Sequence, residues 1–138
     1  MKRVINMDTY IGCSIIFYDD ENRVLISKRI RYKKKFPLLW ETIGGALENN
    51  ETPEECIKRE VMEEINCKID ELKLFKVYVV SESTERYVLI VYTGKIDGQI
   101  NHNSEIEEIR WIEKSQINEF EFGGNDLEKI LDYYGNHQ

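Results

Sequence analysis

Three glutamates, Glu60, Glu63 and Glu64, have the spacing that places their side chains on one arc of a helix. Glu60 and Glu64 are i,i+4 neighbours, and Glu60 and Glu63 are i,i+3 neighbours. Like charges so spaced destabilise an isolated helix by roughly a few tenths of a kcal/mol per pair, and Arg59 can relieve only Glu63. A carboxylate cluster of this kind suits a hard divalent cation, which takes oxygen ligands. A solvated charged face is the alternative interpretation of a glutamate-rich helix.

The residues before these glutamates carry the signals of a helix start. Thr52 is a strong N-cap, Pro53 fits the first helical position, and Glu55 completes a capping box with Thr52. The helix should therefore run from residue 53 to about residue 65, with a narrow apolar stripe formed by Ile57, Val61 and Ile65. Further upstream, residues 40–43 predict a short strand that leads into Gly44 and Gly45, where the backbone can approach a ligand closely.

The stretch from Trp40 to Cys67 resembles the Nudix box, whose pattern is G-x5-E-x7-R-E-U-x-E-E-x-G-U, with U a bulky aliphatic residue. The residues that match this pattern are Gly45, Glu51, Arg59, Glu60, Val61, Glu63 and Glu64. Two positions depart from it, because the final glycine is Asn66 and the final aliphatic residue is Cys67. Asn is the non-glycine residue that best tolerates the left-handed conformation at a helix end, and Cys behaves as a small hydrophobe. Neither departure replaces a metal ligand of the pattern.

The resemblance implies a hydrolase that uses Mg²⁺ or Mn²⁺ and acts on a nucleoside diphosphate linked to another group. It implies that Glu60 and Glu64 bind the metal directly, and that Glu63 is a further ligand or holds a metal-bound water. The carbonyl of Gly44 is expected as another ligand. The box residues expected to be structural are Gly45, Glu51 and Arg59. Family members pair the Glu and Arg side chains to fix the box loop on the helix.

A fourth carboxylate is expected from a loop downstream of the box. Glu105 stands six residues before Trp111, which is the spacing that MutT-like members show between this glutamate and the tryptophan of the next strand. We therefore expect Glu105 to act as a metal ligand or as the general base. Glu107 and Glu108 are the alternatives, and both also fit an exposed strand edge.

The sequence specifies the substrate less clearly than the metal-binding residues. Markers that the resemblance associates with ADP-ribose, dinucleoside polyphosphates and NADH are absent, which leaves the MutT-like conversion of a (d)NTP to NMP and pyrophosphate. Lys28 matches a basic position near the substrate phosphates, and Asn125 lies where MutT-like members have an asparagine that binds a purine base. Asn125 also fits a helix N-cap, and Thr42 replaces an aromatic residue, which counts against tight purine stacking. The basic run at residues 28–35 is either a phosphate-facing rim or a solvated loop.

The sequence leaves two other functions open. One is hydrolysis of another diphosphate, such as a nucleotide sugar or a 5′-capped RNA. The other is a non-enzymatic domain that senses a nucleotide, which the intact Glu60, Glu63 and Glu64 argue against.

The composition indicates one globular domain over residues 1–138, with 41% hydrophobic and 33% charged residues. A net charge of −7 argues against a nucleic acid polymer as a partner, whereas a small nucleotide or other diphosphate can bind through intervening cations. No apolar run is long enough for a membrane span, and the three cysteines show no CxxC pair. We therefore expect free thiols in a cytoplasmic protein that is a monomer or a homodimer.

The rest of the pattern predicts the elements that must position the glutamates. Strands are expected at residues 10–18, 23–28, 68–80, 86–97 and 108–113, and a closing helix at residues 125–134. The first two strands should form an opening hairpin, the next two a second hairpin, and residues 1–9 a loosely held arm. The pattern alone indicates an α+β or α/β fold. The resemblance implies the α/β Nudix fold, an α/β/α sandwich around a mixed β-sheet.

Overall fold

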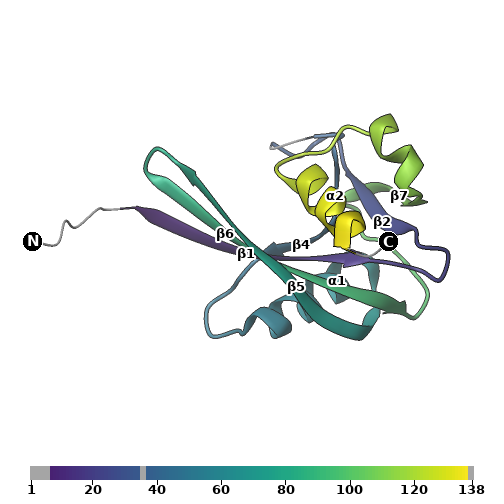
Figure 1. Ribbon diagram of the computed structural model, residues 1–138. Helices are drawn as coiled ribbons and strands as arrows, with labels where there is room; N and C mark the ends of the chain where they lie inside the picture. The colour runs from purple at the N-terminus through teal and green to yellow at the C-terminus, as the bar shows by residue number, and fades with distance from the viewer. Residues whose placement is uncertain (1–6, 35–36, 137–138) are drawn as a thin grey trace, which may run out of the picture.

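The computed structural model describes residues 7–34 and 37–136, which form two β-sheets flanked by helices (Figure 1). The larger sheet has the strand order β4-β1-β6-β5 and consists of β1 (Asp8–Phe17), β4 (Ile43–Ala46), β5 (Lys68–Glu82) and β6 (Glu85–Asp97). The smaller sheet has the order β3-β2-β7 and consists of β2 (Val24–Arg29), β3 (Trp40–Glu41) and β7 (Ile106–Ile112). The helices are α1 (Pro53–Ile65), the 3-10 helix η1 (Lys114–Glu119) and α2 (Asp126–Asn136).

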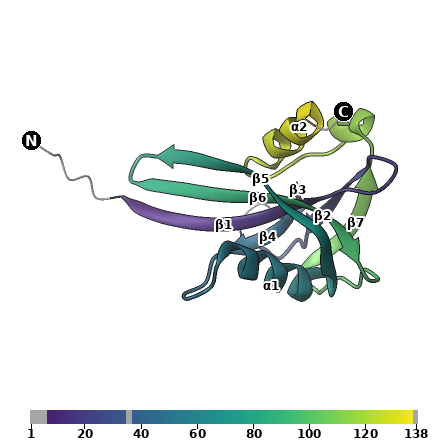
Figure 2. The same cartoon turned by 60° about the horizontal axis from the view of Figure 1, so that its bottom comes forward.

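The two α-helices cover opposite sides of the strands, as Figure 2 shows with α1 below and α2 above. β1 runs parallel to β6, whereas β1 and β4, and β5 and β6, are antiparallel pairs, so the larger sheet is mixed. The expected α/β fold with helices around a mixed sheet is therefore confirmed. The expected second hairpin is confirmed too, because β5 and β6 pair along nearly their whole length.

The first two strands do not form the hairpin that the sequence predicted. The chain reverses at residues 19–22, and Tyr18 and Val24 form one antiparallel bridge. Beyond that bridge β1 pairs with β4 and β6, while β2 pairs with β3 and β7 in the other sheet. Residues 13–17 and 24–27 are buried consecutively rather than at alternate positions. A strand covered on both faces belongs in the middle of a sheet, so each of these strands takes a central position in a sheet of its own.

Part of the arm predicted for residues 1–9 belongs to a strand. Asp8 and Thr9 lie in β1 and pair with Glu85 and Arg86, and the N–H of Asp8 donates to the carbonyl of Thr84 at 3.0 Å. Residues 1–6 of the predicted arm lie outside the described residues. β1 therefore begins at Asp8, and together with β5 and β6 it extends away from the rest of the fold (Figure 1).

α1 has the boundaries that its capping signals predicted. The N–H of Glu55 donates to Oγ1 of Thr52 at 3.2 Å, and the N–H of Thr52 donates to Oε1 of Glu55 at 3.0 Å. At the other end Asn66 is left-handed, with φ 57° and ψ 40°, and its N–H donates to the carbonyl of Met62. The buried side of the helix consists of Cys56, Ile57, Val61 and Ile65. These residues belong to the core cluster that also contains the inward side chains of β1.

Residues 40–46 cross from one sheet to the other. β3 pairs with β2 in the smaller sheet, and β4 pairs with β1 in the larger sheet, so the single short strand of the prediction is interrupted at Thr42. This crossing places Gly44 and Gly45 between β1 and α1.

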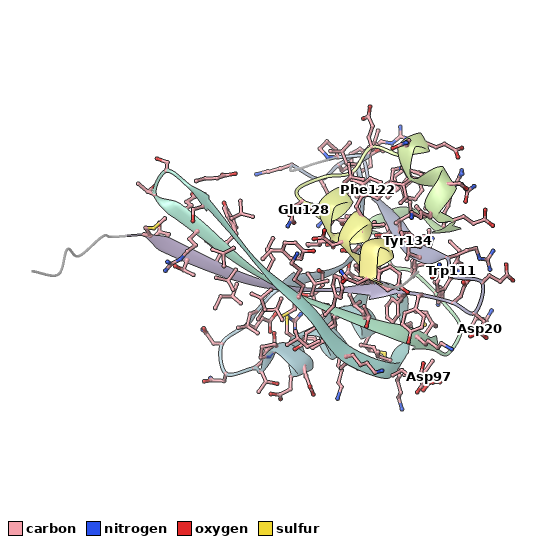
Figure 3. All side chains as sticks on the ribbon, in the orientation of Figure 1. Asp20, Asp97, Trp111, Phe122, Glu128 and Tyr134 are labelled. Carbon is pink, nitrogen blue, oxygen red and sulfur yellow. The ribbon has the colours of Figure 1, made fainter. Side chains whose placement is uncertain are left out.

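α2 packs on a second core cluster, on the other side of the fold from α1. The hydroxyl of Tyr134 lies 3.0 Å from the carbonyl oxygen of Asn22 and 3.3 Å from that of Ile112. Figure 3 shows Tyr134 on the side of α2 that faces β2 and β7. Among the described residues, the helices are too short or too polar to cross a membrane.

Candidate active site

A cavity of about 390 Å³ lies where β4, α1, the first turn of α2 and the loop before β7 meet. Its acidic lining residues are Glu41, Glu60, Glu64, Glu105 and Asp126. Its basic lining residues are Arg29, Lys33 and Lys129. Acidic and basic side chains from segments that are far apart in the sequence thus lie together in this cavity.

Glu60 and Glu64 form the acidic centre of this cavity. The side chain of Glu60 is 14% exposed, and Oε2 of Glu64 is buried without a hydrogen-bond partner among the described residues. The pKa of Glu64 is well above the usual range of a carboxyl group, mainly because the group is buried and next because the Glu60 carboxylate is its neighbour. A hydrogen bond from the backbone of Gly44 offsets this only in part. The pair is therefore a place where positive charge from a ligand would be strongly favoured.

Gly44 and Gly45 allow β4 to fit between β1 and α1. A Cβ at Gly44 would lie 2.2 Å from the carbonyl oxygen of Cys13, which belongs to the backbone of β1. A Cβ at Gly45 would lie 2.4 Å from Oε1 of Glu60. The first glycine lets the two strands approach each other, and the second leaves room for a carboxylate of the site.

Arg59 ties the loop after β4 to the helix. Its Nη2 lies 2.9 Å from Oε1 of Glu51 and 3.1 Å from the carbonyl oxygen of Ala46. Its Nη1 lies 2.9 Å from Oε1 of Glu60 and 3.2 Å from Oε2 of Glu63. The hydrogen bond from this guanidinium, and next the one from the backbone N–H of Glu48, lower the pKa of Glu51 to about 2. Arg59 therefore holds the loop and orients Glu60 at the same time.

Glu63 lies at the edge of this arrangement and does not line the cavity. Its side chain is 56% exposed and pairs with Arg59. At 100° per residue, Glu64 lies about 40° from Glu60 toward the buried stripe, whereas Glu63 lies about 60° from Glu60 on the other side. Of the three clustered glutamates, the fold brings Glu60 and Glu64 into the cavity.

The residues present fit a divalent cation that keeps several of its waters. Among the described residues, no group of three or more His, Cys, Asp or Glu side chains stands in an arrangement that could hold a metal ion. Glu60 and Glu64 nevertheless supply neighbouring carboxylates, one of them with an unpartnered buried oxygen. Mg²⁺ commonly binds through one or two carboxylates and keeps several waters, so this donor set is sufficient for it. The Gly44 carbonyl, Glu63 and Glu105 stay predictions as further ligands.

Glu105 is the downstream carboxylate that reaches the cavity. Its side chain is 60% exposed, and Oε1 lies 3.1 Å from Nζ of Lys33, another lining residue. Glu107 instead pairs with Arg31 at 3.1 Å, and Glu108 pairs with Arg110. The geometry thus favours Glu105 over its two neighbours, while its catalytic role stays a prediction.

The two residues predicted to contact substrate lie outside the cavity lining. Lys28 pairs with Glu107 at 3.9 Å and lies 5.9 Å from the centroid of the Trp40 ring, whereas Arg29 lines the cavity. Asn125 precedes α2, and its Nδ2 is buried without a partner in the described part of the chain. Of the basic run, Arg29 and Lys33 reach the cavity, and residue 35 lies outside the described residues.

The cavity also contains charged residues that sequence reasoning missed. Glu41 lies 3.1 Å from Nη1 of Arg29, and burial raises the pKa of Glu41 although Arg29 opposes this. In the first turn of α2, Nζ of Lys129 lies 3.0 Å from Oδ1 of Asp126. A charged residue inside the short strand before Gly44 was a signal for Glu41. Asp126 and Lys129 have the i,i+3 spacing of an ordinary solvated pair, so nothing in the sequence distinguishes them.

This chain resembles known proteins both in sequence and in fold. A family model described as NUDIX domain matches residues 9–134. A prenyl-diphosphate phosphatase of Methanosarcina mazei is 31% identical to this chain, over 75% of this chain and 63% of its own length. An 8-oxo-dGTP diphosphatase of Proteus vulgaris is 32% identical, over 56% of this chain and 67% of its own length. The chain thus spans somewhat under two thirds of the length of the first of these relatives. The crystal structure of a MutT protein from Methanosarcina mazei superposes with a TM-score of 0.78 at 16% identity, covering 98% of this chain and 100% of that one.

Proposed function

Because the chain belongs to the Nudix family, we propose that it is a metal-dependent pyrophosphohydrolase that hydrolyses a nucleoside diphosphate linked to another group. Its preferred reaction in this proposal is the conversion of a (d)NTP to NMP and pyrophosphate. The observation that carries the proposal is the pair of Glu60 and Glu64 in the cavity, with one buried oxygen unpartnered among the described residues. The names of the two relatives, a diphosphatase and a prenyl-diphosphate phosphatase, support the same class of reaction.

The residues of the cavity suit the steps of such a reaction. A bound Mg²⁺ or Mn²⁺ would neutralise phosphate charge and lower the pKa of a bound water, and Glu60, Glu64 and the Gly44 carbonyl would hold it. Arg29 and Lys33 line the same cavity and would pair with phosphate oxygens. When Lys33 exchanges Glu105 for a phosphate, the Glu105 carboxylate is free to accept the proton of the attacking water. The bridging phosphorus–oxygen bond then breaks, and pyrophosphate leaves with the electron pair.

The other substrates of the family stay as alternatives within this proposal. A nucleotide sugar or a 5′-capped RNA would undergo the same reaction at phosphorus. A nucleotide-sensing domain would not need Glu60 and Glu64 together in a cavity, so their placement favours an enzyme. The three cysteines are free thiols, which supports the cytoplasm as the compartment.

A panel of (d)NTPs, nucleotide sugars and capped RNA, each with Mg²⁺ or Mn²⁺, tests the proposal. The products to be measured are phosphate, pyrophosphate and NMP. We expect NMP and pyrophosphate from a (d)NTP, and at least a roughly hundredfold lower turnover in Glu60→Gln and Glu64→Gln. Glu54→Gln is the matched control, because Glu54 is an exposed glutamate in the first turn of the same helix.

Two results would contradict the proposal. One is that the wild type binds a nucleotide but hydrolyses none of the panel with either metal, which would indicate a sensor. The other is that Glu60→Gln and Glu64→Gln keep the turnover of Glu54→Gln, which would move the reaction away from this cavity.

A further inference from the structure

The wall of the cavity at α2 carries buried polar groups that the proposed reaction does not use. Four such residues, each at least nine-tenths buried, line it: Ser14 (8% exposed), Thr42 (5%), Asp126 (9%) and Lys129 (6%). They come from β1, from the crossing between the sheets and from the first turn of α2. Burying charges on a cavity wall is costly unless they are paired and their hydrogen-bonding capacity is used.

These groups hydrogen-bond to each other but do not use all of their hydrogen-bonding capacity. Nζ of Lys129 lies 3.0 Å from Oδ1 of Asp126 and 3.3 Å from Oγ of Ser14, and Thr42 donates to the same Oδ1 at 3.1 Å. An ammonium group has three donors, so in the described part of the chain one N–H of Lys129 is unused. The bonds that the described residues make to the Asp126 carboxylate all fall on Oδ1, which leaves Oδ2 as an acceptor. Two paired residues of the lining thus have one unused donor and one unused acceptor between them in the described part of the chain.

A second polar contact already anchors α2 on the larger sheet. Further along α2, Lys76 from β5 already lies 3.0 Å from Oδ2 of Asp132, and the hydroxyl of Tyr78 donates to the same atom at 2.6 Å. That contact joins the helix to the larger sheet at the surface, where an ion pair loses little solvation. The pair of Asp126 and Lys129 therefore calls for an explanation that involves the cavity.

We propose that Asp126 and Lys129 select the group attached to the diphosphate, and that they select a neutral polar group with a hydrogen-bond acceptor beside a donor. The amide edge of a nucleobase and a pair of sugar hydroxyls both have this chemistry. A hydrocarbon chain such as a prenyl group would cover the unused donor and acceptor without bonding to them. Sites built to bond a polar group reject analogues that lack it by roughly 10⁴-fold. This inference rests on the proposed function, because it names the substrate class of the same site.

The test compares Lys129→Met with Lys76→Met on the best polar substrate of the panel and on isopentenyl diphosphate. Both variants remove a lysine that pairs with an aspartate of α2, but only Lys129 lines the cavity. We expect the wild type to prefer the polar substrate, and Lys129→Met to raise its KM by at least about tenfold with kcat changed less than about threefold. Hydrolysis of isopentenyl diphosphate should not fall in parallel, so selectivity drops. Lys76→Met should keep the wild-type selectivity.

A second variant, Asp126→Asn, shows whether the recognised polar group belongs to a nucleobase or to a sugar. It also serves as the test if Lys129→Met does not fold. The substitution turns a carboxylate oxygen into a donor. A changed order of preference among the four bases of the (d)NTPs indicates a nucleobase, and a changed order among nucleotide sugars with one base indicates sugar hydroxyls. Either change supports the inference.

Several results would overturn the inference while leaving the proposed function intact. These are a wild type that prefers isopentenyl diphosphate, variants at both positions with wild-type selectivity, and an equal loss of selectivity in Lys76→Met. Failure of the wild type to hydrolyse any diphosphate would instead overturn the proposed function, and the inference with it.

Discussion

The Cα of Gly45 faces the carboxylate of Glu60 so closely that a Cβ at position 45 would lie 2.4 Å from Oε1. The strand β4 and the helix α1 thus meet at a position where only a glycine leaves the carboxylate in place. The same Oε1 of Glu60 lies 2.9 Å from Nη1 of Arg59. The spacing between the glycine and the glutamates of the box therefore has a direct steric basis.

Gly45→Ala should lower activity more than stability. The new methyl group meets the end of a flexible side chain, so Glu60 can move aside at the expense of its position in the cavity. We expect turnover to fall by at least about tenfold and the free energy of unfolding to change by less than about 1 kcal/mol.

Gly44→Ala is the matched control, because its methyl group would meet the backbone carbonyl of Cys13 at 2.2 Å. The strands must then separate, with an expected loss of about 1–3 kcal/mol or more. Urea unfolding and turnover of both variants check the contrast. Equal stability of the two variants would contradict it.

Glu64 should make the metal-free protein less stable as the pH rises. Its pKa is raised in the folded protein by burial and by Glu60, above the value of about 4.3 that it has when unfolded. A raised folded pKa gives stability that is complete below the unfolded pKa and is lost as the pH rises through the folded pKa. Glu64→Gln removes this loss, so its advantage over wild type in EDTA should grow between about pH 5 and pH 8. Urea midpoints at a series of pH values measure it, and a constant difference would refute the prediction.

Divalent metal should raise the melting temperature, because it binds the carboxylates in the folded state only. In EDTA, Glu64→Gln should melt about 3 °C or more above wild type, and it should gain less from Mg²⁺ or Mn²⁺. Glu63→Gln is the control, because Glu63 is exposed and paired with Arg59, and it should not melt above wild type in EDTA. Thermal scans in which Glu63→Gln and Glu64→Gln respond alike would show that the repulsion does not reside at Glu64.

Asn66 should tolerate glycine but not a β-branched residue. Its φ of 57° and ψ of 40° are in the left-handed region, which costs a β-branched side chain most. Asn66→Gly should therefore be neutral or slightly stabilising, whereas Asn66→Val should lose roughly 1–2 kcal/mol. Val should also reduce turnover, because Glu64 lies in the last turn of the helix that Asn66 ends. Denaturant unfolding of both variants decides this, and equal stability would mean that the left-handed cap contributes nothing.

The sequence alone was sufficient for the caps of α1 and for one of the two predicted hairpins. Thr52 and Glu55 form a capping box across three residues, and Asn66 ends the helix with its own backbone conformation. The hairpin of β5 and β6 is likewise a contact between adjacent segments. Such features depend on local hydrogen bonds and backbone preferences, which the order of residues expresses directly.

Only the tertiary structure decided which side chains meet from distant segments. β1 and β2 separate into different sheets because each is buried on both faces and finds its partners elsewhere in the chain. Lys129 meets Ser14 across 115 residues, and no local pattern distinguishes that lysine from a solvated one. The spacing of the box predicted a cluster of carboxylates, but the packing of α1 on β4 determined that Glu64 is partly buried, with Oε2 out of contact with solvent, while Glu63 stays exposed. Burial depends on what the rest of the chain places against a helix face, and for that reason periodicity by itself could not assign it.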